Sequence, residues 1–311
     1  MADQAAFDIF QSVKNFLYLG DYNKCLDEVS NLDINYEDLS QEIFKNFYTF
    51  LSLIESQKYQ EIDNLLSQLK NSSEKQKKIC HHLFLFLVMY VYKGKFDAKR
   101  FENYYKELNE SKIYDPTIFP AIYVLSLICL KRKEYAKFLP FIEKFECEIE
   151  ILSLKFHLMM MLNQEEEMQK IINSMELKDS DSTIFQLCKI IYDLYYKNNW
   201  EQSISSLQTI SKNNKVSPKI FNLIGLALMN KGNFDEAIKI IKLGKESCEK
   251  NEEISLDYHC LLVNAITCYR NLGKYDEIKN LEEYLKKNDP SNDYFLKEKL
   301  FDDNFDSAIA N

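Results

Sequence analysis

Three consecutive residues, Cys80, His81 and His82, are the first candidates for chemistry in this sequence. Thiolate and imidazole groups are preferred ligands of Zn²⁺. The segment has a helical composition, and neighbouring helical residues point about 100° apart, so the three side chains cannot share one ion. His259 and Cys260 have no Asp or second His one helical turn away. We therefore expect core or surface roles for these residues, and no metal site.

Motifs of nucleotide-binding and hydrolytic enzymes are missing from the sequence. There is no GxxxxGK[ST], no GxSxG and no HExxH. The Lys-Gly-Lys at 93–95 is interpreted as a turn. An enzyme would require a pocket that gathers ionisable groups with perturbed pKa values. The sequence therefore predicts a protein that is not an enzyme and that needs no cofactor.

Charge and hydropathy exclude further classes. The 311 residues carry a net charge of −9, which should repel nucleic acid and anionic lipid headgroups. The longest apolar run, Leu83 to Tyr92, is shorter than the roughly 20 residues of a membrane-spanning helix and predicts a buried helix. The N-terminal residues lack a signal-peptide pattern. The 8 cysteines form no CxxC pair and are expected to be reduced thiols of a cytosolic protein.

The elements that would position any site are predicted to be helices. Only 6 Gly and 5 Pro interrupt the chain. In the stretch Phe221 to Gly244, small Gly225 and Ala237 allow two antiparallel helices to approach closely, and Gly232 suits the turn between them. This stretch resembles a tetratricopeptide repeat, which cannot bury its apolar face alone and therefore predicts further copies.

Similar turns recur along the chain. Each has an aromatic residue, or its replacement, two positions after the residue that ends a helix, and the spacings run from 30 to 41 residues. Tetratricopeptide repeats are about 34 residues long. The marker residues are Tyr22, Tyr59, Phe96, Tyr135, Glu165, Trp200, Phe234 and Tyr275.

The predicted fold is all-α, a tetratricopeptide-like helical-repeat solenoid of about eight helix pairs over 1–289. Residues 290–311 are expected to form a C-terminal capping helix, with Phe301, Phe305 and Ile309 spaced by four. Repeats are expected to be least regular around 95–180. There, Glu165 replaces the aromatic marker, and Pro140 falls inside a second helix that is expected to start late or to kink.

A partner-binding surface is predicted on the concave side, which the first helices of successive repeats line. The predicted residues are Phe84, Val88, Tyr92, Tyr123, Leu127, Phe185, Cys188, Tyr192, Tyr195 and Tyr196. Such an apolar lining suggests an enclosed protein partner. The alternative is a solenoid that closes on itself, in which these residues are ordinary core. Asn222 and Arg270 are isolated polar residues, which disfavours a groove that clamps the acidic C-terminus of chaperones.

The two ends of the sequence resemble the epsilon subunit of coatomer. Phe7 to Glu28 contains a Val-Lys-Asn helix, then Gly-x-Tyr, then a helix with Cys and Glu, and Leu272 to Ala308 contains Leu-Gly-Lys, Tyr284-Leu285 and Pro290. The resemblance implies a non-catalytic structural subunit of the coat on Golgi-derived vesicles. It also implies that the solenoid curls around the C-terminal domain of the alpha subunit and stabilises it in Golgi-to-ER retrograde transport.

The same resemblance implies partners and location. The alpha subunit would be the direct partner, the rest of the coat an indirect one, and the membrane would be reached only through the coat. The protein would be cytoplasmic and peripheral on Golgi membranes and coated vesicles. Another tetratricopeptide adaptor or complex-assembly scaffold remains the alternative, which a groove lined by Lys, Asn and Arg would favour.

Overall fold

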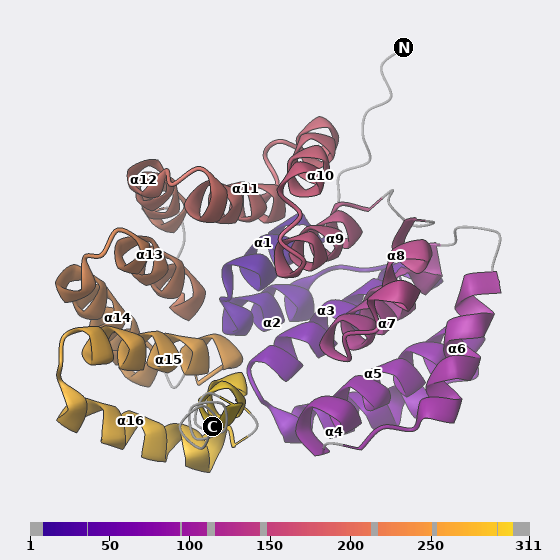
Figure 1. Cartoon of the computed structure of the whole chain (residues 1–311). Coiled ribbons are helices and arrows are strands. Elements are labelled where there is room, and N and C mark those ends of the chain that lie inside the picture. The colour runs from indigo at the N-terminus through magenta and orange to yellow at the C-terminus, as the bar shows by residue number, and fades with distance from the viewer. Residues whose placement is uncertain are drawn as a thin grey trace, which may run out of the picture. The chain divides into compact units, whose positions relative to one another are not determined.

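The computed structural model describes residues 9–35, 37–93, 95–110, 116–143, 148–212, 217–250, 254–290 and 292–300. These residues contain helices and turns but no strand, which confirms the predicted all-α class (Figure 1). The chain divides into two compact units, Met1–Lys197 (unit 1) and Asn198–Asn311 (unit 2). The sequence-based boundary between 289 and 290 stays a prediction.

Unit 1 contains the first eleven α-helices and one short 3₁₀ helix. They are α1 (Gln11–Leu19), α2 (Tyr22–Asn31), α3 (Leu39–Glu55), α4 (Tyr59–Lys70), α5 (Lys75–Lys93), α6 (Ala98–Glu110), η1 (Pro116–Ile118), α7 (Phe119–Lys131), α8 (Tyr135–Glu143), α9 (Ile149–Met161), α10 (Glu165–Lys178) and α11 (Thr183–Tyr196).

Unit 2 contains the remaining helices. They are α12 (Trp200–Lys212), α13 (Pro218–Asn230), α14 (Phe234–Lys250), α15 (Leu256–Asn271) and α16 (Tyr275–Asn288), followed by a helical segment over 293–300. In chain order the labelled α-helices alternate as first and second helices of the repeats that the sequence pattern predicts. Phe301, Phe305 and Ile309 lie outside the described residues, as does Gly94 in the third turn.

The turns inside the pairs share one backbone conformation. The residue two positions before each marker has a positive φ in seven turns, whether it is a glycine or not: Gly20, Gln57, Lys133, Asn163, Asn198, Gly232 and Gly273. At Gly232 the backbone N–H donates to the carbonyl of Met229, and the next N–H, of Asn233, donates to Leu228, both at 2.9 Å. This pair of bonds satisfies carbonyls at the end of the first helix and reverses the chain.

The second helix of each pair begins at or just after the marker. Seven second helices start at the marker itself, and α6 starts two residues beyond Phe96. The start of α10 at Glu165 shows that the turn does not require the aromatic side chain. Of the two alternatives for the helix that contains Pro140, the late start is wrong, because α8 begins at Tyr135 and includes Pro140, and the kink stays a prediction.

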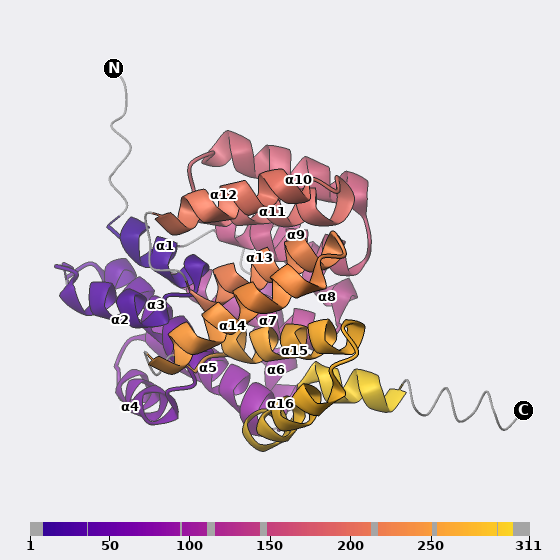
Figure 2. The ribbon, with the colours of Figure 1, turned by 90° about the vertical axis from the view of Figure 1, so that its left-hand side faces the viewer.

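The core of unit 1 is rich in aromatic side chains. The rings of Phe50 in α3 and Phe84 in α5 stack with centroids 4.0 Å apart and an interplanar angle of 4°. The first helix, α1, packs against α2 and also against α11, near the end of the unit (Figures 1 and 2). A hydrogen bond of 2.8 Å from Thr183 Oγ1 to Asn15 Oδ1 joins α11 to α1. Within unit 1, the repeats therefore bring distant parts of the sequence together.

Unit 2 contains the close helix pair that the glycine spacing predicts. Gly225 in α13 and Gly244 in α14 are buried, and a Cβ added to Gly244 would lie 2.7 Å from Cβ of Phe221. Ala237, at the corresponding contact in α14, is fully buried. The two helices can approach this closely only because these positions carry small residues.

The apolar run Leu83 to Tyr92 forms part of α5, as expected. Among the described residues, no helix combines the length and the apolar character needed to cross a bilayer.

Candidate partner-binding surfaces

All ten residues of the predicted concave surface belong to unit 1, and five of them are buried. Phe84, Val88, Phe185, Cys188 and Tyr192 are at most 7% exposed. Tyr123, Leu127 and Tyr196 are partly buried, whereas Tyr195 is 50% exposed. The side chain of Tyr92 lies outside the described part of the chain. The partner-binding role of this set stays a prediction, and accessibility divides the set into contact candidates and supporting residues.

One of these residues, Tyr123, lies close to the buried carboxylate of Glu150 and to Cys188. Glu150 in α9 is 2% exposed, and its Oε1 lies 3.2 Å from Nζ of Lys14 in α1. Burial raises the pKa of the Tyr123 hydroxyl, and the negative charge of Glu150 raises it further. Burial also raises the pKa of the Cys188 thiol to about 12. Both the thiol and the phenol therefore stay protonated at neutral pH, which suits a structural role.

Tyr195, the exposed residue of the predicted surface, lies at the C-terminal end of α11, near the turn that follows α9. The rings of Tyr192 and Tyr196 stack 5.6 Å apart, and the Tyr196 hydroxyl donates to Asn163 Oδ1 at 3.0 Å. This bond fixes the end of α11 against the turn that follows α9. The exposed apolar side chains at the C-terminal ends of α9 and α11 are Tyr195 (50%), Met161 (46%) and Leu162 (39%). We call these three residues the unit 1 apolar edge.

Sequence reasoning missed Met161 and Leu162. The run of three methionines at 159–161 was visible, but the burial pattern was not. Met159 is 6% exposed and Met161 is 46% exposed, because successive helical residues face different sides.

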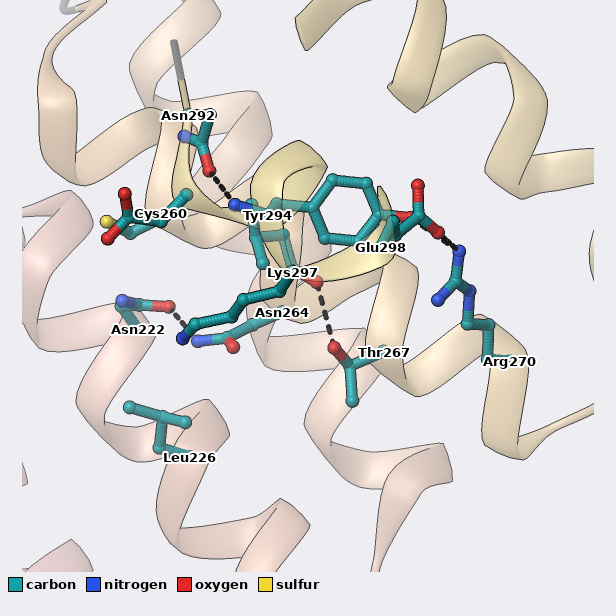
Figure 3. A pocket seen from close by; sticks show the side chains of 12 residues that line it. Asn222, Leu226, Cys260, Asn264, Thr267, Arg270, Asn292, Tyr294, Lys297 and Glu298 are labelled. Carbon is teal, nitrogen blue, oxygen red and sulfur yellow. Dashed lines mark hydrogen bonds and ion pairs between the residues drawn. The ribbon is translucent and has the colours of Figure 1, made fainter. Parts of the chain in front are cut away.

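Unit 2 contains an open pocket of about 760 Å³ whose lining includes several polar side chains (Figure 3). It is bounded by α13, α15 and the segment 293–300. The lining residues are Asn222, Leu226, Cys260, Val263, Asn264, Thr267, Arg270, Asn292, Asp293, Tyr294, Lys297 and Glu298.

The expectation that Asn222 and Arg270 are isolated is wrong. Both line the same pocket, because they lie on α13 and α15, which are in contact. Nδ2 of Asn264 donates to Oδ1 of Asn222 at 2.6 Å. The sequence could not show this pairing, since it joins two repeats.

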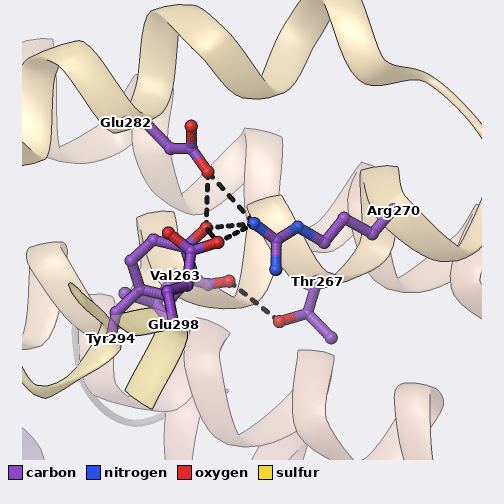
Figure 4. A network of polar contacts seen from close by, with 6 residues as sticks. All are labelled: Val263, Thr267, Arg270, Glu282, Tyr294 and Glu298. Carbon is purple, nitrogen blue, oxygen red and sulfur yellow. Dashed lines mark hydrogen bonds and ion pairs between the residues drawn. The ribbon is translucent and has the colours of Figure 1, made fainter. Parts of the chain in front are cut away.

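Arg270 is neutralised within unit 2 (Figure 4). Its guanidinium donates to Oε1 of Glu282 at 3.1 Å and to the Tyr294 hydroxyl at 2.5 Å, and it pairs with Glu298. Burial raises the pKa of Tyr294, and hydrogen bonds to the two carboxylates raise it further. This network holds the segment 293–300 against α15. Arg270 therefore has its charge compensated before any partner binds.

Of the three consecutive candidates for metal binding, Cys80 is buried, while the rings of His81 and His82 lie 5.1 Å apart. Cys80 is 3% exposed, and burial raises its pKa to about 12. Nδ1 of His82 forms a 2.6 Å hydrogen bond with the Tyr104 hydroxyl. Among the described residues, no group of three His, Cys, Asp or Glu side chains is arranged to hold a metal ion.

Consecutive helices joined by turns of one repeated geometry define the class of tetratricopeptide-like helical-repeat proteins. A family model described as the coatomer epsilon subunit matches residues 6–311. The chain therefore belongs to the coatomer epsilon-subunit family, and this membership gives it the general role of a coatomer subunit.

Two solved structures are only distantly similar to the chain. None of the curated proteins matches the chain. A solved structure titled MamA AMB-1 is 13% identical, with a TM-score of 0.34, and the match covers 54% of this chain and 96% of that one. A mutant form of MamA is also 13% identical, with a TM-score of 0.33, and the match covers 61% of this chain and 98% of the other.

Proposed function

We propose that this protein is a non-catalytic structural subunit of coatomer that binds and stabilises the C-terminal domain of the alpha subunit. It would act in Golgi-to-ER retrograde transport, in the cytoplasm and peripherally on Golgi membranes and coated vesicles. The family match over residues 6–311 is the observation that carries this proposal. Contact with the rest of the coat, and with the membrane, would be indirect.

The structure supports a binding role through the unit 1 apolar edge. Tyrosine and methionine are enriched at protein interfaces, and rigid aromatic anchors supply much of the binding energy. Tyr195 and Met161 are accessible, whereas buried Phe185, Cys188 and Tyr192 would hold α11 in place. A partner that covers this edge stabilises the folded state by mass action, since only the folded protein presents it.

Co-expression with the C-terminal domain of the alpha coatomer subunit from the same organism tests the proposal. We expect co-elution in size-exclusion chromatography at one-to-one stoichiometry, together with a higher melting temperature of the complex. Two folded proteins that elute separately at micromolar concentration would overturn the alpha-subunit assignment.

The second candidate is another tetratricopeptide adaptor or complex-assembly scaffold. The open pocket of unit 2 favours it, because Asn222, Asn264 and Lys297 resemble the polar lining of a peptide groove. Retention of the protein by an immobilised acidic peptide, without co-elution of the alpha domain, would support this alternative.

A further inference from the structure

A second cavity, of about 320 Å³, lies in unit 1 between α5 and the turn that leads into α6. Its apolar wall consists of Leu85, Phe86, Met89 and Phe96. The first three follow the i, i+1, i+4 pattern of one helical face. Phe84, which was predicted for the concave surface, points elsewhere and stacks on α3. The cavity is therefore separate from the surfaces described above.

The wall of this cavity is held in place by its surroundings. The guanidinium of Arg132 lies 3.6 Å from the ring centroid of Phe96. The Phe96 ring also lies 5.2 Å from the ring of Phe101 and 6.2 Å from that of Phe86. The N–H of Lys95 donates to the carbonyl of Met89 at 3.1 Å, which ties the turn to the end of α5. A cavity walled by such a cluster requires little ordering when a ligand enters.

The rim of the cavity is cationic. Lys95 and Arg100 both line it and are exposed, and neither has an ion pair with a described residue. Asp97, the acidic residue of the rim, accepts the N–H of Arg100 at 3.1 Å and so caps α6. His82 is held by Tyr104, and burial, with the charge of Arg100, lowers its pKa. Lys95 and Arg100 outnumber Asp97 at this rim, whereas the chain as a whole carries a net charge of −9.

We propose that this cavity binds a short acidic segment of a partner protein. One leucine or phenylalanine side chain of that segment enters between Leu85, Phe86 and Met89, and a neighbouring carboxylate contacts Lys95 and Arg100. The volume, about 320 Å³, is near the lower limit of ligand pockets, which suits one or two side chains rather than a whole helix. The apolar wall supplies the binding energy, and the cations select acidic sequences. This proposal does not rest on the alpha-subunit assignment.

Fluorescence anisotropy of a labelled peptide tests the proposal with the full-length protein. The probe is a short peptide that carries one leucine between Asp and Glu residues. We expect saturable binding that weakens about tenfold in the double variant Lys95→Gln with Arg100→Gln. Lys99→Gln is the matched control, since Lys99 is exposed on α6 but does not line the cavity. Equal melting temperatures would show that the variants are folded.

Two further probes test the apolar wall and the cationic rim of the cavity separately. A peptide with Ala in place of the leucine should bind at least about tenfold more weakly, because it leaves the apolar wall unfilled. Phosphatidylserine vesicles test whether the cations serve a membrane surface instead. Equal binding by the double variant, equal binding of the Ala peptide, or vesicle binding without peptide binding would each overturn the proposal.

Discussion

At the scale of single residues, the residue two positions before the marker adopts a left-handed backbone conformation in seven turns, whether or not it is a glycine. The φ angle at this position is positive in Gly20, Gly232 and Gly273, but also in Asn163 and Asn198. Asparagine tolerates the left-handed region better than most residues, so the turn can form without glycine. Glycine is therefore required less by these turns than by the helix contacts of unit 2.

A substitution at Gly244 tests this distinction. Gly244→Ala should destabilise the protein by about 1–3 kcal/mol, because its Cβ would lie 2.7 Å from Cβ of Phe221, which is close to the backbone and cannot move freely. Gly232→Asn is the control, since no atom lies within 4 Å of the new Cβ and asparagine occupies the equivalent turn position at 163 and 198. Thermal unfolding measures the stability of both variants. An equal loss of stability in Gly244→Ala and Gly232→Asn would contradict the prediction.

Cysteine reactivity provides a second test at this scale. Burial raises the pKa of Cys25, Cys80, Cys129 and Cys188 to about 12. The thiolate is the reactive form, so these buried thiols should react much more slowly than an exposed thiol at the same pH. Cys260 is exposed and should react first with a thiol reagent at pH 8.

The thiol assay is best run in a Cys147→Ser background, because Cys147 lies outside the described residues. In that background, Cys260→Ser should abolish the fast phase of labelling. A fast phase that persists would show that a thiol described as buried is accessible.

At the scale of elements, α1 is held to the far end of unit 1 by polar contacts. The Lys14–Glu150 pair joins α1 to α9, and the Thr183–Asn15 bond joins α11 to α1. Glu150 is 2% exposed, so removal of its partner leaves a buried charge. Lys14→Met should therefore destabilise unit 1 by about 3 kcal/mol or more.

Amide hydrogen exchange in α1 and α9 measures this effect. Glu150→Gln in the Lys14→Met background should restore most of the lost protection, since it removes the unpaired charge. If both helices keep their full protection in Lys14→Met alone, the ion pair does not hold α1 in place.

The segment 293–300 gives a second test at this scale. Arg270→Ala should remove its contacts with Glu282, Tyr294 and Glu298 and thereby increase amide exchange over 293–300, while α15 stays protected. Lys274→Ala, a substitution of an exposed cation beyond the end of α15, is the control. Unchanged exchange over 293–300 in Arg270→Ala would show that apolar contacts alone hold the segment.

At the scale of the whole molecule, the proposed alpha-subunit interface can be separated from the core. Tyr192 is 4% exposed and its hydroxyl donates to Glu165 at 3.3 Å, so Tyr192→Ala with Tyr196→Ala should disturb folding as well as binding. Tyr195→Ala with Met161→Ala removes accessible side chains instead. Loss of a binding hot spot costs about 2 kcal/mol or more, a roughly thirtyfold weaker complex.

Calorimetric titration with the alpha C-terminal domain measures this loss. Tyr275→Ala is the control, because Tyr275 is 70% exposed and lies in unit 2. If the double variant Tyr195→Ala with Met161→Ala keeps both its melting temperature and its affinity for the alpha domain, the interface does not include the unit 1 apolar edge.

The repeat architecture could be read from the sequence because its signals are local. The end of a helix, the left-handed residue and the start of the next helix lie within one turn of chain, so spacing from Tyr22 to Tyr275 predicted where the second helices begin. The marker Tyr135 gave the correct start of α8, whereas Pro140 suggested a late start or a kink, because the sequence shows the missing N–H of a proline but not the packing that tolerates it. The family resemblance came from residues at both ends and is confirmed by the match over 6–311.

The sequence by itself determined the helical pairs, their turns and the small residues between α13 and α14. Only the tertiary structure decided which inner positions are accessible, since burial of Cys188 or Tyr192 depends on contacts with residues far away in the chain. It also brought Asn222 and Arg270 to one pocket and placed α1 beside α11. Helix formation depends on neighbours a few residues away, whereas a binding surface depends on how separate repeats pack, and that information is not local.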